Sequence, residues 1–597
     1  MTRWIAPAFL CLLCAVPAGA QDAADSVAPE AATRLPAAFE GLSPEAEAAF
    51  RVKSDNKSVK AEEWMVAAAN PLAVQAGAKV LGDGGSAADA MVAVQAVLGL
   101  VEPQSSGLGG GAFLVWYDGE TGELTTLDAR ETAPLGATPR LFQDAGGEPL
   151  KFWDAVVGGL SVGTPGTPKL LEEAHRRWGR ANWTGLFSEA IELAETGFRV
   201  SPRLAELVDG DQERLQSAPA TAAYFMPGGQ PIRAGDRLRN PDYAATLRAI
   251  AAEGSGAFYA GEIARDIVTT VREAATPGEL SAVDLALYKV IERPAVCADY
   301  RDFDICGMGP PSSGGLTVGQ ILGLLEGFDL AGMGPDSPNA WRLIGDASRL
   351  AFADRGRYMA DSDFVPVPAE GLLAPDYLAS RAALLKRGKA LPEVEPGAPE
   401  WDHAQLWADD ESIEFPSTSH ISIIDAYGNA LSMTTTIENG FGSRLMVRGF
   451  LLNNELTDFS FKSHADGVPI ANRVAPGKRP RSSMAPTIVL RDGRPRLVIG
   501  SPGGSRIIGY VAQAIIAHLD WKMGVQPALA MPHLVNRFGT YDIEEGTEAE
   551  GLATRLDEMG FKTNLRALNS GLHAIAVRPT GLAGGADPRR EGIAIGK

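Results

Sequence analysis

Residues 416–425 read PSTSHISIID, and a strand-like alternation of polar and apolar residues begins just after Thr418. If the Ser417–Thr418 peptide bond is cut, Thr418 gains a free α-amine beside its own hydroxyl. Such a residue holds a nucleophile and a base together, which activates an otherwise weak hydroxyl. The stretch therefore predicts cleavage between Ser417 and Thr418, with Thr418 as the catalytic nucleophile. The other interpretation is an ordinary threonine at the start of a strand, which β-propensity alone favours.

The sequence differs in character on the two sides of Thr418. Residues 160–290 are mostly helical in pattern, and residues 390–417 carry Pro, Asp and Glu with little apolar periodicity. The latter pattern predicts an exposed linker in which a cut is tolerated. After Thr418, strand patterns dominate, for example at 449–455, and one strong helix pattern covers 507–519. Strands combined with helices in this way predict a layered α+β architecture.

Composition and charge limit the possible partners. The chain has 597 residues, of which 45% are hydrophobic and 21% charged, so it is large enough for one big domain or two cores. A net charge of -20 argues against nucleic acid and anionic membranes as partners. Because the sequence has neither a zinc-ligand spacing nor a phosphate-binding loop, we expect no metal and no cofactor.

Residues 1–20 resemble a secretory signal peptide. Arg3 is followed by an apolar run, and Ala18-Gly19-Ala20 is a small-residue cleavage site. No other apolar stretch is long enough to span a bilayer, so we expect an exported protein, periplasmic or secreted, without a membrane anchor. Residues 21–60, rich in Ala, Glu, Ser and Pro, predict a loose lead-in.

The two cysteines outside the signal lie in one predicted hairpin. Residues 296–306 fold back near Arg301-Asp302, which places Cys297 opposite Cys306. In an oxidising compartment this register permits a disulfide, and the alternative is two free, buried thiols.

A glycine pair at residues 503–504 is the second candidate catalytic element. The sequence GSPGGSR at residues 500–506 joins a strand pattern to a helix pattern. Gly503 and Gly504 allow backbone N–H groups to approach a ligand closely, beside the positive end of the following helix. This arrangement suits an oxyanion hole for acyl transfer, and the alternative is an ordinary tight turn.

Charged and hydroxyl side chains form the candidate binding residues. Arg130 follows a strand and could clamp a carboxylate, or could simply pair with Asp128 or Glu131. Ser482 and Ser483 could supply hydroxyls to the same carboxylate. Glu438, Glu455 and Asp458 could hold an ammonium group, although each acid taken alone is more typical of a charged residue on the surface.

From about residue 60 to the C-terminus the chain resembles the γ-glutamyltranspeptidase (glutathione hydrolase) family of N-terminal nucleophile hydrolases. The matching segments, in the family's order, are 70–85, 107–113, 128–134, 310–315, 417–425, 451–459, 479–486, 500–506 and 587–589. The resemblance implies a four-layer αββα sandwich formed by two autoprocessed subunits. These are a large subunit (61–417) and a small catalytic subunit (418–597), which stay associated as a heterodimer.

The resemblance also implies a role for each site residue. Thr418 is the nucleophile, and Thr436 hydrogen-bonds it and supports processing. The remaining assignments are the oxyanion hole (Gly503, Gly504), the α-carboxylate site (Arg130, Ser482, Ser483) and the α-ammonium site (Glu438, Glu455, Asp458). The implied donors are glutathione and other γ-glutamyl compounds, and the acyl group passes to water or to an amino-acid or peptide acceptor.

Two departures from the family and two other functions belong to this prediction. Position 438 is Glu where some relatives have Asn, which leaves the ammonium role intact. The 21 residues between Ser460 and Ser482 contain no Tyr or Trp and are fewer than in relatives with a lid, so we expect an open site that accepts larger donors or γ-linked polymers. The other functions are an acylase acting on glutaryl-type β-lactam side chains and an uncleaved, non-enzymatic homologue.

Overall fold

The computed structural model describes residue 39 and residues 41–403, 405–410, 412, 414–415 and 417–597. The signal peptide predicted at residues 1–20 lies outside the described residues. Ser417 and Thr418 are joined, so the structure is that of the chain before any cut.

Two antiparallel seven-stranded sheets form the centre of the described chain. The first sheet contains, in spatial order, β1 (Val59–Ala61), β22 (Gly581–Ala586), β21 (His573–Arg578), β17 (Arg494–Gly500), β16 (Thr487–Arg491), β9 (Phe303–Gly307) and β8 (Val296–Tyr300). The second contains β23 (Ile593–Gly596), β2 (Met65–Ala68), β10 (Ser419–Ile424), β11 (Ala430–Thr436), β3 (Gly111–Tyr117), β4 (Leu124–Ala129) and β7 (Ile291–Arg293). Each sheet thus takes strands from both sides of Thr418.

The two sheets face each other, as the alternation along β10 shows. Ile421 and Ile423 pack toward the helices, whereas Ser422 faces the other sheet and donates a hydrogen bond to the carbonyl oxygen of His573 at 3.2 Å. Ser432 on β11 makes a similar bond to the Ile499 carbonyl oxygen at 3.1 Å. These strands are buried on both faces, which explains why their apolar alternation is incomplete.

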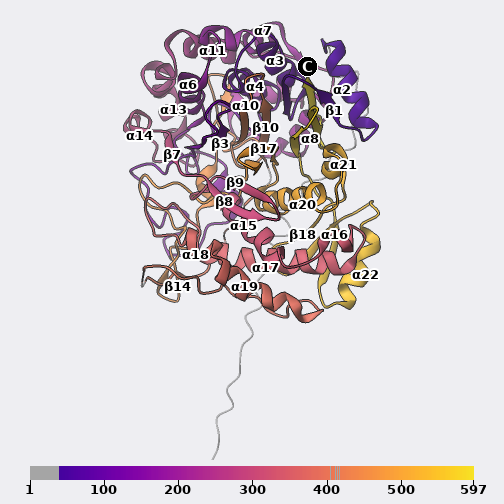
Figure 1. Cartoon of the computed structure of the whole chain (residues 1–597). Helices are drawn as coiled ribbons and strands as arrows, with labels where there is room; N and C mark the ends of the chain where they lie inside the picture. Colours follow the sequence, from indigo (N-terminus) through magenta and orange to yellow (C-terminus); the bar gives the residue numbers. More distant parts are fainter. Residues whose placement is uncertain (1–38, 40, 404, 411, 413, 416) are drawn as a thin grey trace, which may run out of the picture.

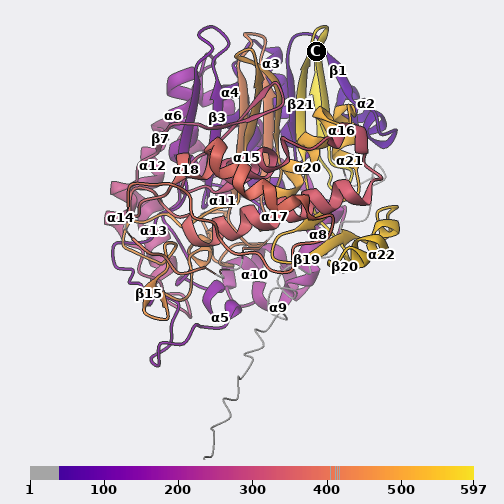
Figure 2. The ribbon, with the colours of Figure 1, turned by 60° about the horizontal axis from the view of Figure 1, so that its bottom comes forward.

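Helices cover both outer faces and complete the four-layer αββα sandwich that the sequence predicted (Figure 1). The helices on the second sheet include α3 (Pro71–Gly82), α4 (Ala87–Val101), α6 (Thr167–Trp178), α7 (Ser188–Thr196), α11 (Pro241–Glu253) and α13 (Gly261–Arg272). Those on the outer side of the first sheet include α15 (Gly314–Leu325), α17 (Pro338–Tyr358) and α20 (Ile507–Leu519). The turned view of Figure 2 shows α15 and α17 lying in front of the strands. Within the described residues, no helix combines the length and the apolar character needed to cross a bilayer.

The β8–β9 hairpin follows the expected register. Cys297 lies opposite Cys306, and the two sulfur atoms form a disulfide. The alternative of two free, buried thiols is therefore wrong.

The expectation of a loose segment at 21–60 is wrong for its later part. Helix α2 (Pro44–Ser54) begins at the cap residue Ser43, whose side chain accepts a hydrogen bond from the Ala46 backbone N–H. Its Phe50 is buried in the core under the second sheet, and β1 then joins the edge of the first sheet. The apolar residues of α2 are few, so its burial against the sandwich was not evident from composition.

Gly110, within the glycine-rich stretch before β3, fixes the spacing between β3 and β11. A Cβ at Gly110 would lie 1.9 Å from the Thr436 carbonyl oxygen and 2.8 Å from Ile437 Cγ2. At such distances the backbone of β11 must move, because no flexible side-chain end can yield instead. Only glycine therefore allows β11 to end where it does.

We predict that Gly110→Ala lowers the free energy of unfolding by at least about 1–3 kcal/mol, the usual cost of overpacking. The matched control is Gly185→Ala, since a Cβ at Gly185 would meet no heavy atom within 4 Å and should change stability by less than about 0.5 kcal/mol. Thermal unfolding followed by circular dichroism measures both. Equal melting temperatures for the two variants would contradict this account of the β3–β11 contact.

Candidate active site

The pairing of β10 with β11 brings Thr418 to Thr436. Ser419 pairs with Thr435, so Thr418 and Thr436 follow as the next opposed residues. Their hydroxyl oxygens are 3.4 Å apart. The register of two central strands therefore sets the distance between these two candidate residues.

The Thr436 hydroxyl also contacts the bond predicted to be cut. It donates a hydrogen bond to the Ser417 carbonyl oxygen at 2.8 Å and accepts one from the Glu438 backbone N–H at 2.8 Å. A donor on this carbonyl oxygen polarises the carbon that the Thr418 hydroxyl would attack.

Two further contacts hold the residues on either side of this bond in place. The Ser417 hydroxyl donates to the Gln104 carbonyl oxygen at 2.9 Å, and Arg590 Nη1 donates to the Thr418 carbonyl oxygen at 3.0 Å. Ser417 and Thr418 are buried, with exposures of 3% and 4%. The expectation that the linker is exposed up to this point is therefore wrong at its end, where the chain enters the site.

The glycine pair lies on the loop between β17 and α20, as predicted. Gly503 and Gly504 have φ values of 138° and 58°, which side chains other than glycine rarely adopt. A Cβ on Gly504 would lie 2.8 Å from the carbonyl carbon of Phe415 and 2.9 Å from the Glu414 carbonyl oxygen. Before any cut, the backbone of residues 414–415 thus covers the candidate oxyanion site.

A turn, rather than the predicted strand over 449–455, carries two of the acidic residues. Only Phe450–Leu451 forms a strand (β13), and a 3₁₀ turn (η4, Glu455–Asp458) follows. The Asn453 side chain explains the change, since its amide donates to the Gly109 carbonyl oxygen at 2.7 Å and its oxygen accepts from the Glu455 N–H at 3.0 Å.

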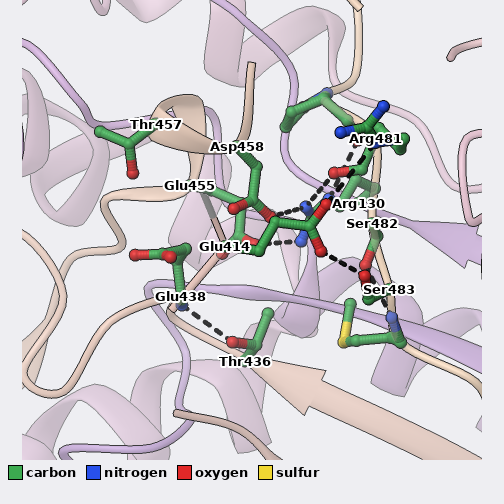
Figure 3. A network of polar contacts seen from close by, with 12 residues as sticks. Arg130, Glu414, Thr436, Glu438, Glu455, Thr457, Asp458, Arg481, Ser482 and Ser483 are labelled. Carbon is green, nitrogen blue, oxygen red and sulfur yellow. Dashed lines mark hydrogen bonds and ion pairs between the residues drawn. The ribbon is translucent and has the colours of Figure 1, made fainter. Parts of the chain in front are cut away.

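Arg130 lies against these acids. Its guanidinium forms ion pairs with Glu455 and Asp458 and donates to the Arg481 carbonyl oxygen at 2.9 Å, as Figure 3 shows. The alternative partner Asp128 instead pairs with Arg293 at 2.8 Å. The structure thus brings the cation and two of the acids assigned to the substrate into direct contact with one another.

The two serines lie beside this group. Ser483 Oγ accepts a hydrogen bond from Arg355 Nη2 at 2.7 Å and donates to the Glu414 carboxylate. Ser482 Oγ accepts from the Met484 N–H at 3.1 Å. Before the cut, the carboxylate that Ser483 contacts is therefore the side chain of Glu414 and not that of a substrate.

One small cavity joins nearly all the predicted residues. Its lining consists of Arg130, Glu414, Phe415, Thr418, Thr436, Glu438, Glu455, Asp458, Ser482, Ser483, Met484, Gly504 and Ile507. Its volume of about 20 Å³ leaves room for little more than one water molecule, because Glu414 and Phe415 occupy the space. No group of three or more His, Cys, Asp or Glu residues placed to hold a metal occurs in the described part of the chain.

The acids of this cavity are too many for the cations beside them. Burial, aided by the nearby Glu455, raises the pKa of Glu438 to about 8. Burial likewise raises the pKa of Glu455 and raises that of Asp458 well above its ordinary value, although Arg130 opposes both shifts. One carboxylate oxygen of Asp458 is buried without a hydrogen-bond partner among the described residues. The site can accordingly accept a further positive group.

The segment predicted to form a shortened lid borders a second cavity. Residues 460–482 contain the small hairpin β14 (His464–Ala465) and β15 (Val468–Pro469), and Phe461 stacks on Phe142 with ring centres 4.6 Å apart. This segment, together with parts of 149–152 and 406–412, lines a cavity of about 930 Å³. Its effect on donor size stays a prediction.

Comparison with known proteins identifies the family. The family model described as Gamma-glutamyltranspeptidase matches residues 73–597. The chain belongs to the gamma-glutamyltranspeptidase family. The glutathione hydrolase proenzyme of Bacillus subtilis (strain 168) is 39% identical over 548 residues, which cover 90% of this chain and 92% of the relative.

Two proteins named as acylases are also similar to this chain. The Acylase ACY 1 proenzyme of Pseudomonas sp. (strain SE83) is 35% identical over 552 residues, covering 91% of this chain and 95% of the relative. The crystal structure of cephalosporin acylase from Bacillus halodurans superposes with a TM-score of 0.79 and 26% identity, over 91% of this chain and 97% of that one. These likenesses agree with the observed αββα fold.

Sequence reasoning missed two residues of this gamma-glutamyltranspeptidase site, Glu414 and Arg355. Burial works to raise the pKa of Glu414, but the Arg355 and Arg481 guanidinium groups outweigh it and lower that pKa. Glu414 stands in a segment rich in acids, and Arg355 stands in the unremarkable stretch Asp-Arg-Gly-Arg at 354–357, so neither carried a local signal. Only the fold brings them together.

We predict a pH-dependent contribution of Glu438 to the stability of the uncleaved chain. Folding raises its pKa from an unfolded value of about 4.3 to about 8, so between these values the folded state holds a proton that the unfolded state has lost. The free energy of unfolding therefore falls as the pH rises through this window and levels off above it.

Thermal melts of Thr418→Ala and Thr418→Ala/Glu438→Gln between pH 5 and 9 isolate this contribution. The single variant should lose a few degrees more than the double variant over that range. Parallel pH profiles would show that Glu438 does not hold the additional proton.

Proposed function

We propose that this protein is a self-processing γ-glutamyl hydrolase and transferase. It would cleave the γ-glutamyl amide of glutathione and related compounds, with Thr418 as the nucleophile. The observation that carries the proposal is the single buried cavity in which the Thr418 hydroxyl meets Arg130, three acids, two serines and Gly504.

The first step is cleavage of the chain by its own threonine. The Thr418 hydroxyl oxygen attacks the carbonyl carbon of Ser417 while Thr436 donates a hydrogen bond to the carbonyl oxygen at 2.8 Å. The C–N bond breaks, the nitrogen takes up a proton to become the Thr418 amine, and an ester joins Ser417 to the threonine oxygen. Water then hydrolyses the ester, which leaves a carboxylate on Ser417 and a free amino-terminal Thr418.

The donor binds through its amino-acid head. Arg130, Ser482 and Ser483 bind the α-carboxylate, and the surplus acids Glu438, Glu455 and Asp458 bind the α-ammonium. An ammonium group would lower the free energy of these ionised carboxylates, whose ionisation burial now opposes. Holding both ends of the head fixes the γ-carbonyl group over Thr418.

Acyl transfer then repeats the chemistry of processing on an external amide. The Thr418 amine takes the proton from its own hydroxyl as the oxygen attacks the γ-carbonyl carbon, and the N–H groups of Gly503 and Gly504 stabilise the oxyanion. The amine returns the proton to the leaving nitrogen, and a γ-glutamyl ester of Thr418 remains. Water or the amine of an amino acid or peptide takes the acyl group and regenerates the threonine.

Processing would give two pieces that stay together as a heterodimer. They are residues 61–417, preceded by the lead-in, and residues 418–597. Each central sheet contains strands from both pieces, for example β2 and β10 in one and β9 and β16 in the other. Separation would expose the edges of both sheets and their shared core. We further propose that the signal predicted at residues 1–20 directs export.

A second candidate function is an acylase acting on glutaryl-type side chains, which the likeness to proteins named as acylases favours. A glutaryl group has a carboxylate but no ammonium. Glu438, Glu455 and Asp458 would then face each other without a positive partner from the substrate. This arrangement makes the γ-glutamyl donor the better match for the cavity.

We predict that replacement of Thr418 abolishes both processing and activity. The wild-type protein should give bands of about 42 and about 19 kDa on a denaturing gel, whereas Thr418→Ala should give one undivided band. Thr418→Ser, which keeps a hydroxyl, serves as the control and should still be cleaved. N-terminal sequencing of the small band should begin at Thr418. An active but undivided wild-type protein would rule out the proposed mechanism.

We also predict a strong preference for an amino-acid head. Relative to γ-glutamyl-p-nitroanilide, glutaryl-p-nitroanilide lacks only the ammonium group, so its kcat/KM should be lower by about 10- to 100-fold, as expected for the loss of a charged hydrogen-bonding group. Faster cleavage of the glutaryl compound would favour the acylase function instead.

A further inference from the structure

Two buried arginines beside the site, Arg355 and Arg481, depend on the segment that precedes the cut. Arg355 forms an ion pair with Glu414, and Arg481 pairs with Asp410 at 3.0 Å and with Glu414 at 3.5 Å. Both arginines are at most 3% exposed. Within the described residues, every ion pair of these two arginines leads to this one segment, as Figure 3 illustrates for Glu414 and Arg481.

The segment cannot keep this position in an active enzyme. The backbone of Glu414 and Phe415 lies against Gly504, where the oxyanion of a donor must form if the proposed function holds. Cleavage frees the end of the segment at Ser417, which allows it to leave. Arg355 then remains as a buried cation whose acidic partner has gone, and an unpaired buried charge is costly.

Other contacts keep Arg355 in place after Glu414 departs. Its Nε donates to Ser313 Oγ at 2.7 Å, and its Nη2 donates to Ser483 Oγ at 2.7 Å. Arg355 lies in the last turn of α17, and Ser313 immediately precedes α15. The guanidinium is therefore fixed by two helices of the scaffold and does not rely on Glu414 for its orientation.

We propose that Arg355, together with Ser483, binds the carboxylate of the donor's amino-acid head, in the place that the Glu414 carboxylate fills before cleavage. This inference rests on the proposed function and adds a second arginine to the carboxylate site. Arg130 shares its charge with Glu455 and Asp458, so a second cation beside it strengthens the carboxylate site. Arg355 supplies the positive charge that processing leaves without a partner.

The test compares donors with and without the head carboxylate. Processed wild-type and Arg355→Met enzymes are assayed with γ-glutamyl-p-nitroanilide and with 4-aminobutanoyl-p-nitroanilide, which lacks only that carboxylate. The ratio of the two kcat/KM values should fall by about 10- to 100-fold in the variant, as for other hydrogen bonds to charged groups. The matched control is Arg342→Met, a buried arginine on the same helix that donates to the Leu385 carbonyl oxygen, and it should keep the wild-type ratio.

A second pair of variants separates binding from folding. Arg355→Met/Glu414→Gln removes both members of the buried ion pair and so leaves no unpaired carboxylate in the precursor. Its ratio is compared with that of Glu414→Gln alone, and the same fall is expected. Calorimetry with L-glutamate should also show binding about 10- to 100-fold weaker when Arg355 is replaced.

The outcomes distinguish this inference from the function on which it rests. If replacing Arg355 lowers both kcat/KM values equally and keeps their ratio, Arg355 only supports Ser483, and the inference is wrong although the proposed function stands. If wild-type enzyme cleaves no γ-glutamyl compound, the proposed function itself is wrong.

Discussion

The antiparallel register between β10 and β11 is the constraint on which the site depends. It places the Thr436 hydroxyl on the carbonyl oxygen of Ser417 and beside the hydroxyl of Thr418. A shift of either strand by one residue would turn its threonine to the opposite face of the sheet, away from the other threonine. The close contact of β11 with Gly110 and the hydrogen bonds between the two sheets hold that register, so the precision of the chemistry derives from the centre of the sandwich.

Charge balance explains why the same cavity can serve two successive reactions. Before the cut, Glu414 pairs with Arg355, and Glu455 and Asp458 pair with Arg130, so both guanidinium groups have acidic partners without a substrate. In the proposed function, the carboxylate of a zwitterionic head replaces that of Glu414, and its ammonium meets the acids whose ionisation burial opposes. A neutral or singly charged ligand would not match both the free arginine and the surplus acids, and this proposed match would give specificity without a large apolar pocket.

The sequence could predict those parts of the fold and site that have a local cause. The hairpin joining Cys297 to Cys306 and the helix at 507–519 both follow from residues near one another in the chain. Helix α2 and the turn at Glu455–Asp458 could not be predicted in this way. Tertiary burial determines the helix, and hydrogen bonding by the Asn453 side chain determines the turn. Likewise, no local pattern could show that Arg355 and Glu414, 59 residues apart, form one ion pair.

Both sheets contain strands drawn from either side of the Ser417–Thr418 bond, and this has a consequence for biogenesis. In the proposed mechanism, the Thr418 hydroxyl meets the Ser417 carbonyl carbon only after distant parts of the polypeptide have assembled into the complete sandwich. Under that mechanism a misfolded molecule would lack the geometry for the cut, so maturation would depend on correct assembly. Activity would therefore arise only in molecules whose fold is complete.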